Sequence, residues 1–291
     1  MRAAGPLVST AWLESNLDSP TLRIIDIRGQ VLPPGSTPRY LSKEADYRIA
    51  HVPGARFLDW TRDIVDATDT VPMQVAPEKA FSESMGRLGI GRDSIVLAYD
   101  DYNHIFAGRL SWALRYYGHE AALVLDGGWS RWKAEGRALS SDTPDSSPAT
   151  FSARARPSLR RTVEEVSRAL GRRDVLMVDA RAPDQYAGRS SVARRPGHIP
   201  GARNVHYARL IDPKTGQFRS EGELAHVFAG AGVDVSHLPP EIIVYCNSGV
   251  SCTVVLNALR LLGRDDAAVY DGSWNEWGND EMLPATLGSD P

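Results

Sequence analysis

Cys246 stands between a segment that predicts a buried strand and one that predicts a helix. Ile242–Tyr245 is apolar and rich in β-branched residues, and apolar residues then recur at helical spacing as far as Leu262, before Gly263. Where a strand turns tightly into a helix, backbone N–H groups and the positive end of the helix point at the side chain on the strand tip. A thiol there has a lowered pKa and is the nucleophilic thiolate. Gly249 allows the intervening loop to curl.

The alternative is that Cys246 is a small buried apolar residue at a strand end. A second cysteine, Cys252, follows six positions later in the first turn of the expected helix. A regulatory disulfide between the two is conceivable if their Cα atoms lie within about 7 Å. No cysteine–histidine group in the sequence has the spacing of metal ligands, so we expect no metal.

Composition narrows the class of protein. A chain of 291 residues with 42 % hydrophobic residues can build two domains, and a net charge of -3 gives no basic footprint for nucleic acid. Two cysteines cannot form a disulfide framework, which favours a reducing compartment. No apolar run is long enough to span a membrane, and no secretory apolar core follows Met1–Pro6. We therefore expect a cytoplasmic protein with neither nucleic-acid nor membrane partners.

The strand and helix around Cys246 belong to a pattern that occurs twice. The turn His51–Arg56 returns as His198–Arg203, and Tyr99-Asp100 returns 146 residues later as Tyr245-Cys246. The block Asp126–Trp129 likewise returns as Asp271–Trp274. Strand and helix patterns alternate in both halves, which predicts an α/β fold of two duplicated domains, each with a mainly parallel sheet flanked by helices.

The repeat also predicts the limits of the two domains and which of them carries the nucleophile. Residues 141–158 are rich in Ser, Pro, Asp and Thr without periodicity, so we expect a linker there, between domains at 1–140 and 159–291. Asp100 occupies the cysteine position in the first domain, and no glycine-rich loop follows it. Only the second domain can therefore form a covalent sulfur intermediate. Features that both halves share, such as His51 and His198 or the Asp179–Arg181 pair, are expected to serve the fold.

These features together resemble the tandem rhodanese family of two-domain sulfurtransferases over essentially the whole chain. The matching blocks are Asp179–Arg181, Gly197–Ala202, Cys246–Ser251 and Tyr270–Trp277. The resemblance implies that Cys246 takes a sulfane sulfur from thiosulfate, holds it as a persulfide and passes it to cyanide or a thiol. It implies no cofactor, because six amide N–H groups of the loop can stabilise the outer sulfur. A thioredoxin-like protein is a further candidate acceptor, and 3-mercaptopyruvate is the alternative donor.

The donor site follows from the same resemblance. The loop residues Asn247, Ser248, Gly249, Val250 and Ser251 are expected to bind the substrate. The Ser248 hydroxyl favours mercaptopyruvate, whereas Asn247 fits neither donor type. Arg189, Arg194 and Arg195 lie where the family usually places its anion-binding arginines, although the family's Gly-Arg pair reads Asp184-Gln185 here. These arginines could equally form a solvated basic loop.

The sequence leaves two other functions to be considered. A cysteine phosphatase carries an arginine after the five loop residues, where this chain has Cys252. Without that guanidinium to hold the phosphoryl oxygens, the phosphatase interpretation is weak. The other rival is a non-catalytic sulfur-carrier module, in which a partner protein loads Cys246.

Overall fold

The computed structural model describes residues 5–144 and 147–291, which divide into two compact units. The first unit contains the chain up to residue 67, together with 75–156 and 213–217. The second unit contains residues 68–74, 157–212 and 218–291, so each unit includes a short segment from the other half of the sequence. Residues 1–4 of the expected first domain and 145–146 of the expected linker lie outside the described residues.

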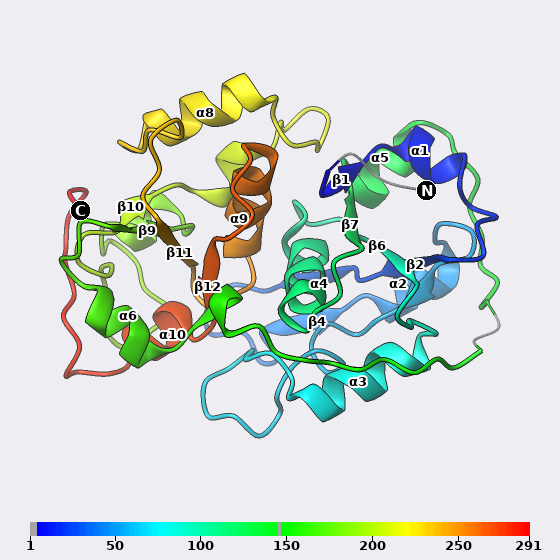
Figure 1. Cartoon of the computed structure of the whole chain (residues 1–291), viewed down its shortest axis with the longest axis horizontal. Helices are drawn as coiled ribbons and strands as arrows, with labels where there is room; N and C mark the ends of the chain where they lie inside the picture. The colour runs from blue at the N-terminus through cyan, green and yellow to red at the C-terminus, as the bar shows by residue number, and fades with distance from the viewer. Residues whose placement is uncertain (1–4, 145–146) are drawn as a thin grey trace. The chain divides into compact units, whose positions relative to one another are not determined.

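The first unit is built on a parallel five-stranded sheet with the order β1-β7-β6-β2-β5 (Figure 1). Its strands are β1 (Leu7–Val8), β2 (Leu22–Asp26), β5 (Arg56–Phe57), β6 (Ile95–Tyr99) and β7 (Ala122–Leu125), with the separate hairpin β3 (Gly29–Val31) and β4 (Tyr40–Ser42). Its helices are α1 (Thr10–Glu14), α2 (Glu44–Ile49), α3 (Glu78–Arg87), α4 (Ile105–Tyr116) and α5 (Gly128–Ala134).

The second unit repeats this arrangement with the order β10-β9-β11-β12-β8, again parallel. Its strands are β8 (Arg160–Arg161), β9 (Val175–Asp179), β10 (Arg203–Asn204), β11 (Glu241–Tyr245) and β12 (Ala268–Tyr270). Its helices are α6 (Val163–Ala169), α7 (Pro183–Tyr186), α8 (Glu221–Ala229), α9 (Cys252–Leu261) and α10 (Ser273–Trp277), with 3-10 turns at Pro157–Leu159 and Tyr207–Leu210. The predicted duplication and the parallel α/β class are confirmed.

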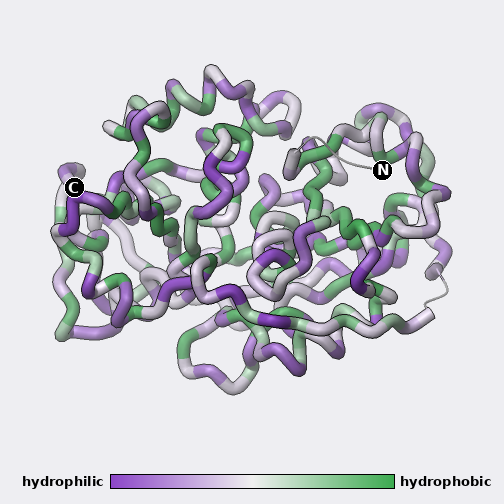
Figure 2. The backbone as a smooth tube through the Cα atoms, viewed as in Figure 1, coloured by the Kyte–Doolittle hydropathy of each residue, from purple (hydrophilic) through white to green (hydrophobic). Residues whose placement is uncertain are grey.

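Hydropathy explains which elements form the interior of each unit. Strand β7 runs green in Figure 2, and all four of its residues are buried, as a strand covered on both faces requires. Helix α8 alternates purple and green because it buries only Leu224, Val227 and Phe228. Helix α9 is different, since every residue from Cys252 to Leu259 is buried. The helix that follows the candidate nucleophile is therefore held from all sides.

The features shared by both halves serve the fold, as the sequence predicts. The buried Asp26–Arg28 pair, at 2.8 Å, is repeated by Asp179–Arg181 at 2.6 Å. His51 and His198 stack on tyrosine rings and contact backbone carbonyls through Nδ1. Trp129 and Trp274 hold equivalent buried positions in the two units, and Phe106, Trp112 and Asp271 are buried as well.

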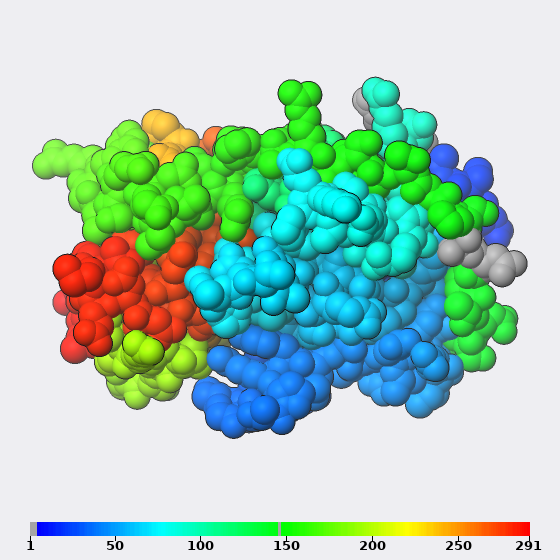
Figure 3. Space-filling model, turned by 90° about the horizontal axis from the view of Figure 1, so that it is seen from below, coloured from blue at the N-terminus to red at the C-terminus, as the bar shows by residue number. Residues whose placement is uncertain are grey.

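The segment expected as a linker has no helix or strand between residues 147 and 156. Its backbone nevertheless bonds to the first unit, with the Ala149 N–H donating to Gly86 O and the Arg156 N–H to Tyr116 O. In Figure 3 it lies on the surface beside the cyan residues of α3. Phe151 is buried there, so this segment takes part in the packing of the first unit.

Candidate active site

Cys246 directly follows strand β11, and the loop that leads from it to α9 curls over its side chain. Gly249 takes a φ of 71°, which folds the loop back over the thiol. Cys246 is only 1 % exposed and Cys252 is fully buried, whereas Asn247 and Ser251 are half-buried. Asn247 and Ser251 are therefore the most exposed residues of the loop that carries Cys246.

The surroundings of Cys246 favour its ionised form. Burial, the largest single influence, raises the pKa of Cys246, but hydrogen bonds outweigh it. These come from the Cys252 thiol, the Ser251 hydroxyl and the backbone N–H groups of Ser248 and Cys252, and they lower the pKa to about 5. The thiolate, the form that attacks sulfur, therefore predominates at neutral pH.

Ser273 fixes the other side of this loop. Its hydroxyl accepts hydrogen bonds from the backbone N–H groups of Cys246, at 3.1 Å, and Gly249, at 3.0 Å, and donates to Tyr270 O at 2.8 Å. The Gly249 amide therefore points at Ser273. This corrects the expectation that six loop amides all face the sulfur, because the positive φ of Gly249 turns its peptide toward α10.

The start of α10 completes the support of the loop. The Trp274 N–H donates to Cys246 O at 3.0 Å, and the Asn275 N–H donates to Asn247 O at 2.8 Å. Sequence reasoning missed Ser273 as a site residue. The available signal was that the repeat has Gly128 at the equivalent position. In the structure, both residues have a positive φ.

The first unit contains the same cradle, filled by a carboxylate. Asp100 accepts backbone hydrogen bonds from Tyr102, His104, Phe106 and Ala107 at 2.8–3.0 Å. Tyr102 and Phe106 correspond in the repeat to Ser248 and Cys252, the two residues whose amides lower the pKa of Cys246.

The first half lacks a glycine-rich loop after Asp100, as the sequence shows, yet it forms such a cradle without one. Asn103 takes a φ of 55° where the second unit has Gly249, because asparagine tolerates the left-handed region. In both units, the loop surrounds a group that can carry negative charge.

Comparison with known proteins agrees with this architecture. The model of the rhodanese-like domain matches residues 9–135 and 162–280. The chain belongs to the rhodanese family. It is 34% identical over 294 residues to a putative thiosulfate sulfurtransferase of Mycobacterium bovis, covering 97% of this chain and 98% of that protein. It is 36% identical over 281 residues to the thiosulfate sulfurtransferase of Rattus norvegicus, covering 93% and 91%.

A solved structure shows the same fold. SseA from Escherichia coli, described as a 3-mercaptopyruvate sulfotransferase, superposes with a TM-score of 0.82 at 31% identity, covering 93% of this chain and 99% of that one. This rhodanese is therefore a sulfurtransferase with two rhodanese domains. Among the described residues, no helix has the length and apolar character needed to cross a membrane. The same residues contain no His, Cys, Asp or Glu group of metal-site composition.

Two of the three arginines proposed as donor ligands have other partners in this rhodanese. Arg189 pairs with Asp184 at 2.6 Å on the surface. The Arg195 guanidinium donates to the backbone carbonyls of Leu283 and Trp277, at 2.6 and 2.8 Å, and so secures the C-terminal segment. These contacts favour structural roles for both residues over donor binding.

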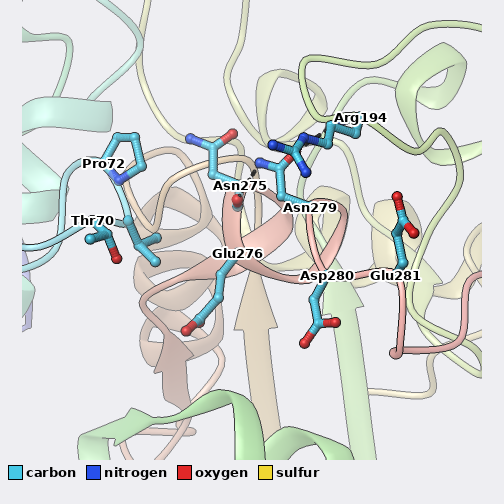
Figure 4. Close-up of a pocket in the computed structure, with 9 residues that line it drawn as sticks. Thr70, Pro72, Arg194, Asn275, Glu276, Asn279, Asp280 and Glu281 are labelled. Carbon is cyan, nitrogen blue, oxygen red and sulfur yellow. Dashed lines mark hydrogen bonds between the residues drawn. The ribbon is translucent and has the colours of Figure 1, made fainter.

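Arg194 has a different setting. It lines a cavity of about 770 Å³ whose wall also holds Glu276, Asp280 and Glu281 (Figure 4). The cavity adjoins the active loop, because the backbone of Asn275 on its rim bonds to Asn247. Three carboxylates against one guanidinium make this cavity unfavourable for a dianion.

Two amide side chains are paired beside the loop. The Asn247 side chain donates to Gln185 Oε1 at 3.3 Å, and Gln185 occupies the position at which the family usually carries arginine. Arg181, which sequence reasoning assigned to the fold alone, also interacts electrostatically with Cys246. Burial lowers the pKa of Arg181, but Asp179 and, more weakly, Cys246 raise it above its usual value. The Arg181 guanidinium and the Cys246 thiolate thus attract each other weakly.

Proposed function

We propose that this rhodanese transfers the sulfane sulfur of thiosulfate to cyanide or a thiol through a persulfide on Cys246. The Cys246 thiolate attacks the outer sulfur of thiosulfate, and sulfite leaves with the electron pair of the broken S–S bond. The acceptor then attacks the outer sulfur of the persulfide and regenerates the thiolate. Two half-reactions on one residue predict ping-pong kinetics.

The single observation that carries this proposal is a buried thiol whose pKa is about 5 in a cradle of N–H donors. The charge stays negative throughout the cycle, first on the thiolate and then on the outer sulfur of the persulfide. Donors fixed in place before the reaction stabilise both without reorganisation. The carboxylate of Asp100 in the equivalent loop supports this interpretation, because that cradle also holds an anion-forming group.

One observation favours thiosulfate as the sulfur donor, and another favours 3-mercaptopyruvate. Relatives named thiosulfate sulfurtransferases favour thiosulfate. The uncharged Gln185–Asn247 pair favours 3-mercaptopyruvate as a second candidate, since a monoanion needs less positive charge than a dianion does. Attack of Cys246 on the sulfur of mercaptopyruvate would release pyruvate and give the same persulfide.

The residues that the sulfur acceptor meets are inferred from the exposure of the side chains around Cys246. Asn247 and Ser251 are the half-buried residues around Cys246, so an acceptor meets these two side chains first. Cyanide and small thiols are slim enough to approach a sulfur that is 1 % exposed. A thioredoxin-like dithiol protein belongs to the same proposal, provided that its reactive thiol projects from its surface.

The test is thiocyanate formation from thiosulfate and cyanide, with 3-mercaptopyruvate assayed in parallel. We expect Cys246→Ser to reduce turnover to background while circular dichroism shows an unchanged fold. We expect Cys252→Ser, which removes the other thiol, still to gain one sulfur by mass spectrometry. Turnover by Cys246→Ser would overturn the mechanism. Loading of the wild-type protein without turnover by either donor would favour the sulfur-carrier alternative.

A further inference from the structure

A second thiol lies beside the candidate nucleophile. Cys252 is the first residue of α9, and its thiol donates a hydrogen bond to Cys246. Neither cysteine forms a disulfide in the structure, and both are buried. The backbone N–H of Cys252 also donates to Cys246, so the backbone as well as the side chain brings the two residues together.

The fold itself does not require a thiol at this position. In the first unit the equivalent residue is Phe106, whose backbone N–H donates to Asp100 at 2.9 Å. Both units therefore have a backbone donor at this position, and the second unit adds the Cys252 thiol to it. The sulfur of Cys252 is additional to what the loop needs for its shape.

The surroundings of Cys252 restrict what its thiol can react with. Its side chain is 0 % exposed, as a residue of a helix buried on all sides must be. Molecules in solution cannot meet it, whereas the sulfur of Cys246 lies within hydrogen-bonding distance. Any chemistry of Cys252 therefore passes through the group on Cys246.

We propose that Cys252 is a resolving thiol, which attacks the inner sulfur of the Cys246 persulfide and releases the outer sulfur as hydrosulfide. This inference rests on the proposed persulfide at Cys246. The bond between the Cys252 and Cys246 sulfurs forms while the bond to the outer sulfur breaks, and the electron pair leaves with the outer sulfur. The proton of the Cys252 thiol moves to the departing sulfur. The outer sulfur is reduced by the two electrons that the two cysteine sulfurs lose.

The step gives this rhodanese a second activity. Sulfur leaves as hydrosulfide without an external acceptor, and the protein is left with a Cys246–Cys252 disulfide. A dithiol reductant must then restore both thiols before the next cycle. External acceptors compete with Cys252 for the same persulfide, so sulfide release is greatest when they are scarce.

The experiment follows a single turnover. The reduced protein is loaded with thiosulfate, freed of excess donor by desalting and incubated without thiol or cyanide. Persulfide is measured by cyanolysis at the start, and sulfide and intact mass are followed with time. We expect sulfide to approach one equivalent per persulfide, and the protein mass to fall to that of the reduced chain less two hydrogens. Peptide mapping should place the disulfide between residues 246 and 252.

The matched variant is Cys252→Ser, which keeps a hydroxyl donor beside Cys246. We expect it to load sulfur and to retain it, with sulfide release reduced at least tenfold. Equal sulfide release by this variant, or a persulfide that persists in the wild type, would overturn the resolving role while leaving the proposed function intact. Failure of the wild-type protein to load sulfur from thiosulfate or 3-mercaptopyruvate would overturn both. Cys252→Ala provides a second variant should the serine protein fail to fold.

Discussion

The hydroxyl of Ser273 accepts a hydrogen bond from the backbone N–H of Cys246 at 3.1 Å, and Ser273 itself has a φ of 53°. The same hydroxyl holds Gly249, so the loop that carries the nucleophile is bonded to the first turn of α10. The first unit has Gly128 at this position, where a Cβ would come within 2.3 Å of Asp100 O. The hydroxyl is therefore a feature of the thiol-bearing half alone.

Ser273→Ala should impair both stability and sulfur transfer. Two buried N–H groups lose their acceptor, and each unsatisfied group costs about 1–3 kcal/mol. The loop then positions Cys246 less well, so we expect kcat/KM for thiosulfate to fall about tenfold or more. Ser273→Gly is the control, because glycine adopts a positive φ without strain. Should the glycine variant match the wild type in activity, the hydroxyl would have no positioning role.

The lowered pKa of Cys246 predicts two pH dependences. Inactivation by iodoacetamide should follow a titration with a midpoint near pH 5, well below the value of about 8.5 for a free thiol. The folded pKa is also depressed relative to the unfolded chain. Between these two values the unfolded state binds more protons, so stability rises with pH, and this contribution is lost as the pH falls through about 5.

The matched comparison for this pH dependence is Cys246→Ala. Its unfolding free energy, measured with urea at several pH values, should lack the contribution that the wild type gains between pH 5 and pH 9. Parallel stability curves for the two proteins, or an alkylation midpoint near pH 8.5, would contradict an ionised Cys246.

Gln185 offers a test of donor choice. Gln185→Arg places a guanidinium beside Asn247, where a charge-assisted hydrogen bond to an anion contributes about 1.5–3 kcal/mol. We expect KM for thiosulfate to fall about tenfold, with a smaller change for 3-mercaptopyruvate, which carries one negative charge fewer. Gln185→Glu, which matches the glutamine in size, should raise KM for both donors. Equal responses of the two donors to arginine would show that charge at this position does not select between them.

Much of this architecture could be predicted from the sequence, because the two duplicated halves can be aligned with each other. The pairing of Tyr99-Asp100 with Tyr245-Cys246 identifies equivalent strand ends, and the structure places them in equivalent strands of two parallel sheets. The Thr162–Glu165 capping box at the start of α6 is also a pattern that the sequence alone shows, since capping depends on residues only three positions apart. The equivalent strand ends and the helix cap could be predicted because they depend on local patterns and on the internal repeat.

The arginines show where sequence reasoning stops. Arg195 lies in the expected loop, yet its guanidinium is directed at carbonyls more than eighty residues away in the chain. Arg181 was assigned to an ion pair with Asp179, which it does form, but its effect on Cys246 depends on how β9 and β11 align. The direction of a long side chain is decided by tertiary contacts that no local pattern records.

Asp100 provides the converse test in the unit without a thiol. Asp100→Ala leaves four backbone N–H groups without their acceptor, so we expect the unfolding free energy to fall by about 3 kcal/mol or more. In thermal unfolding this corresponds to about 10 °C for a unit of this size. Asp100→Asn keeps one oxygen acceptor and places an N–H₂ group against the remaining donors, so its loss should be intermediate.

The alkylation profile of Cys246 serves as the internal readout for these two Asp100 variants. It should be unchanged in both, because the cradle of the second unit takes its donors from its own loop. A stability equal to that of the wild type in Asp100→Ala would mean that the carboxylate is not what holds this loop together. The filled cradle of the first unit would then be a remnant of the duplication without a structural role.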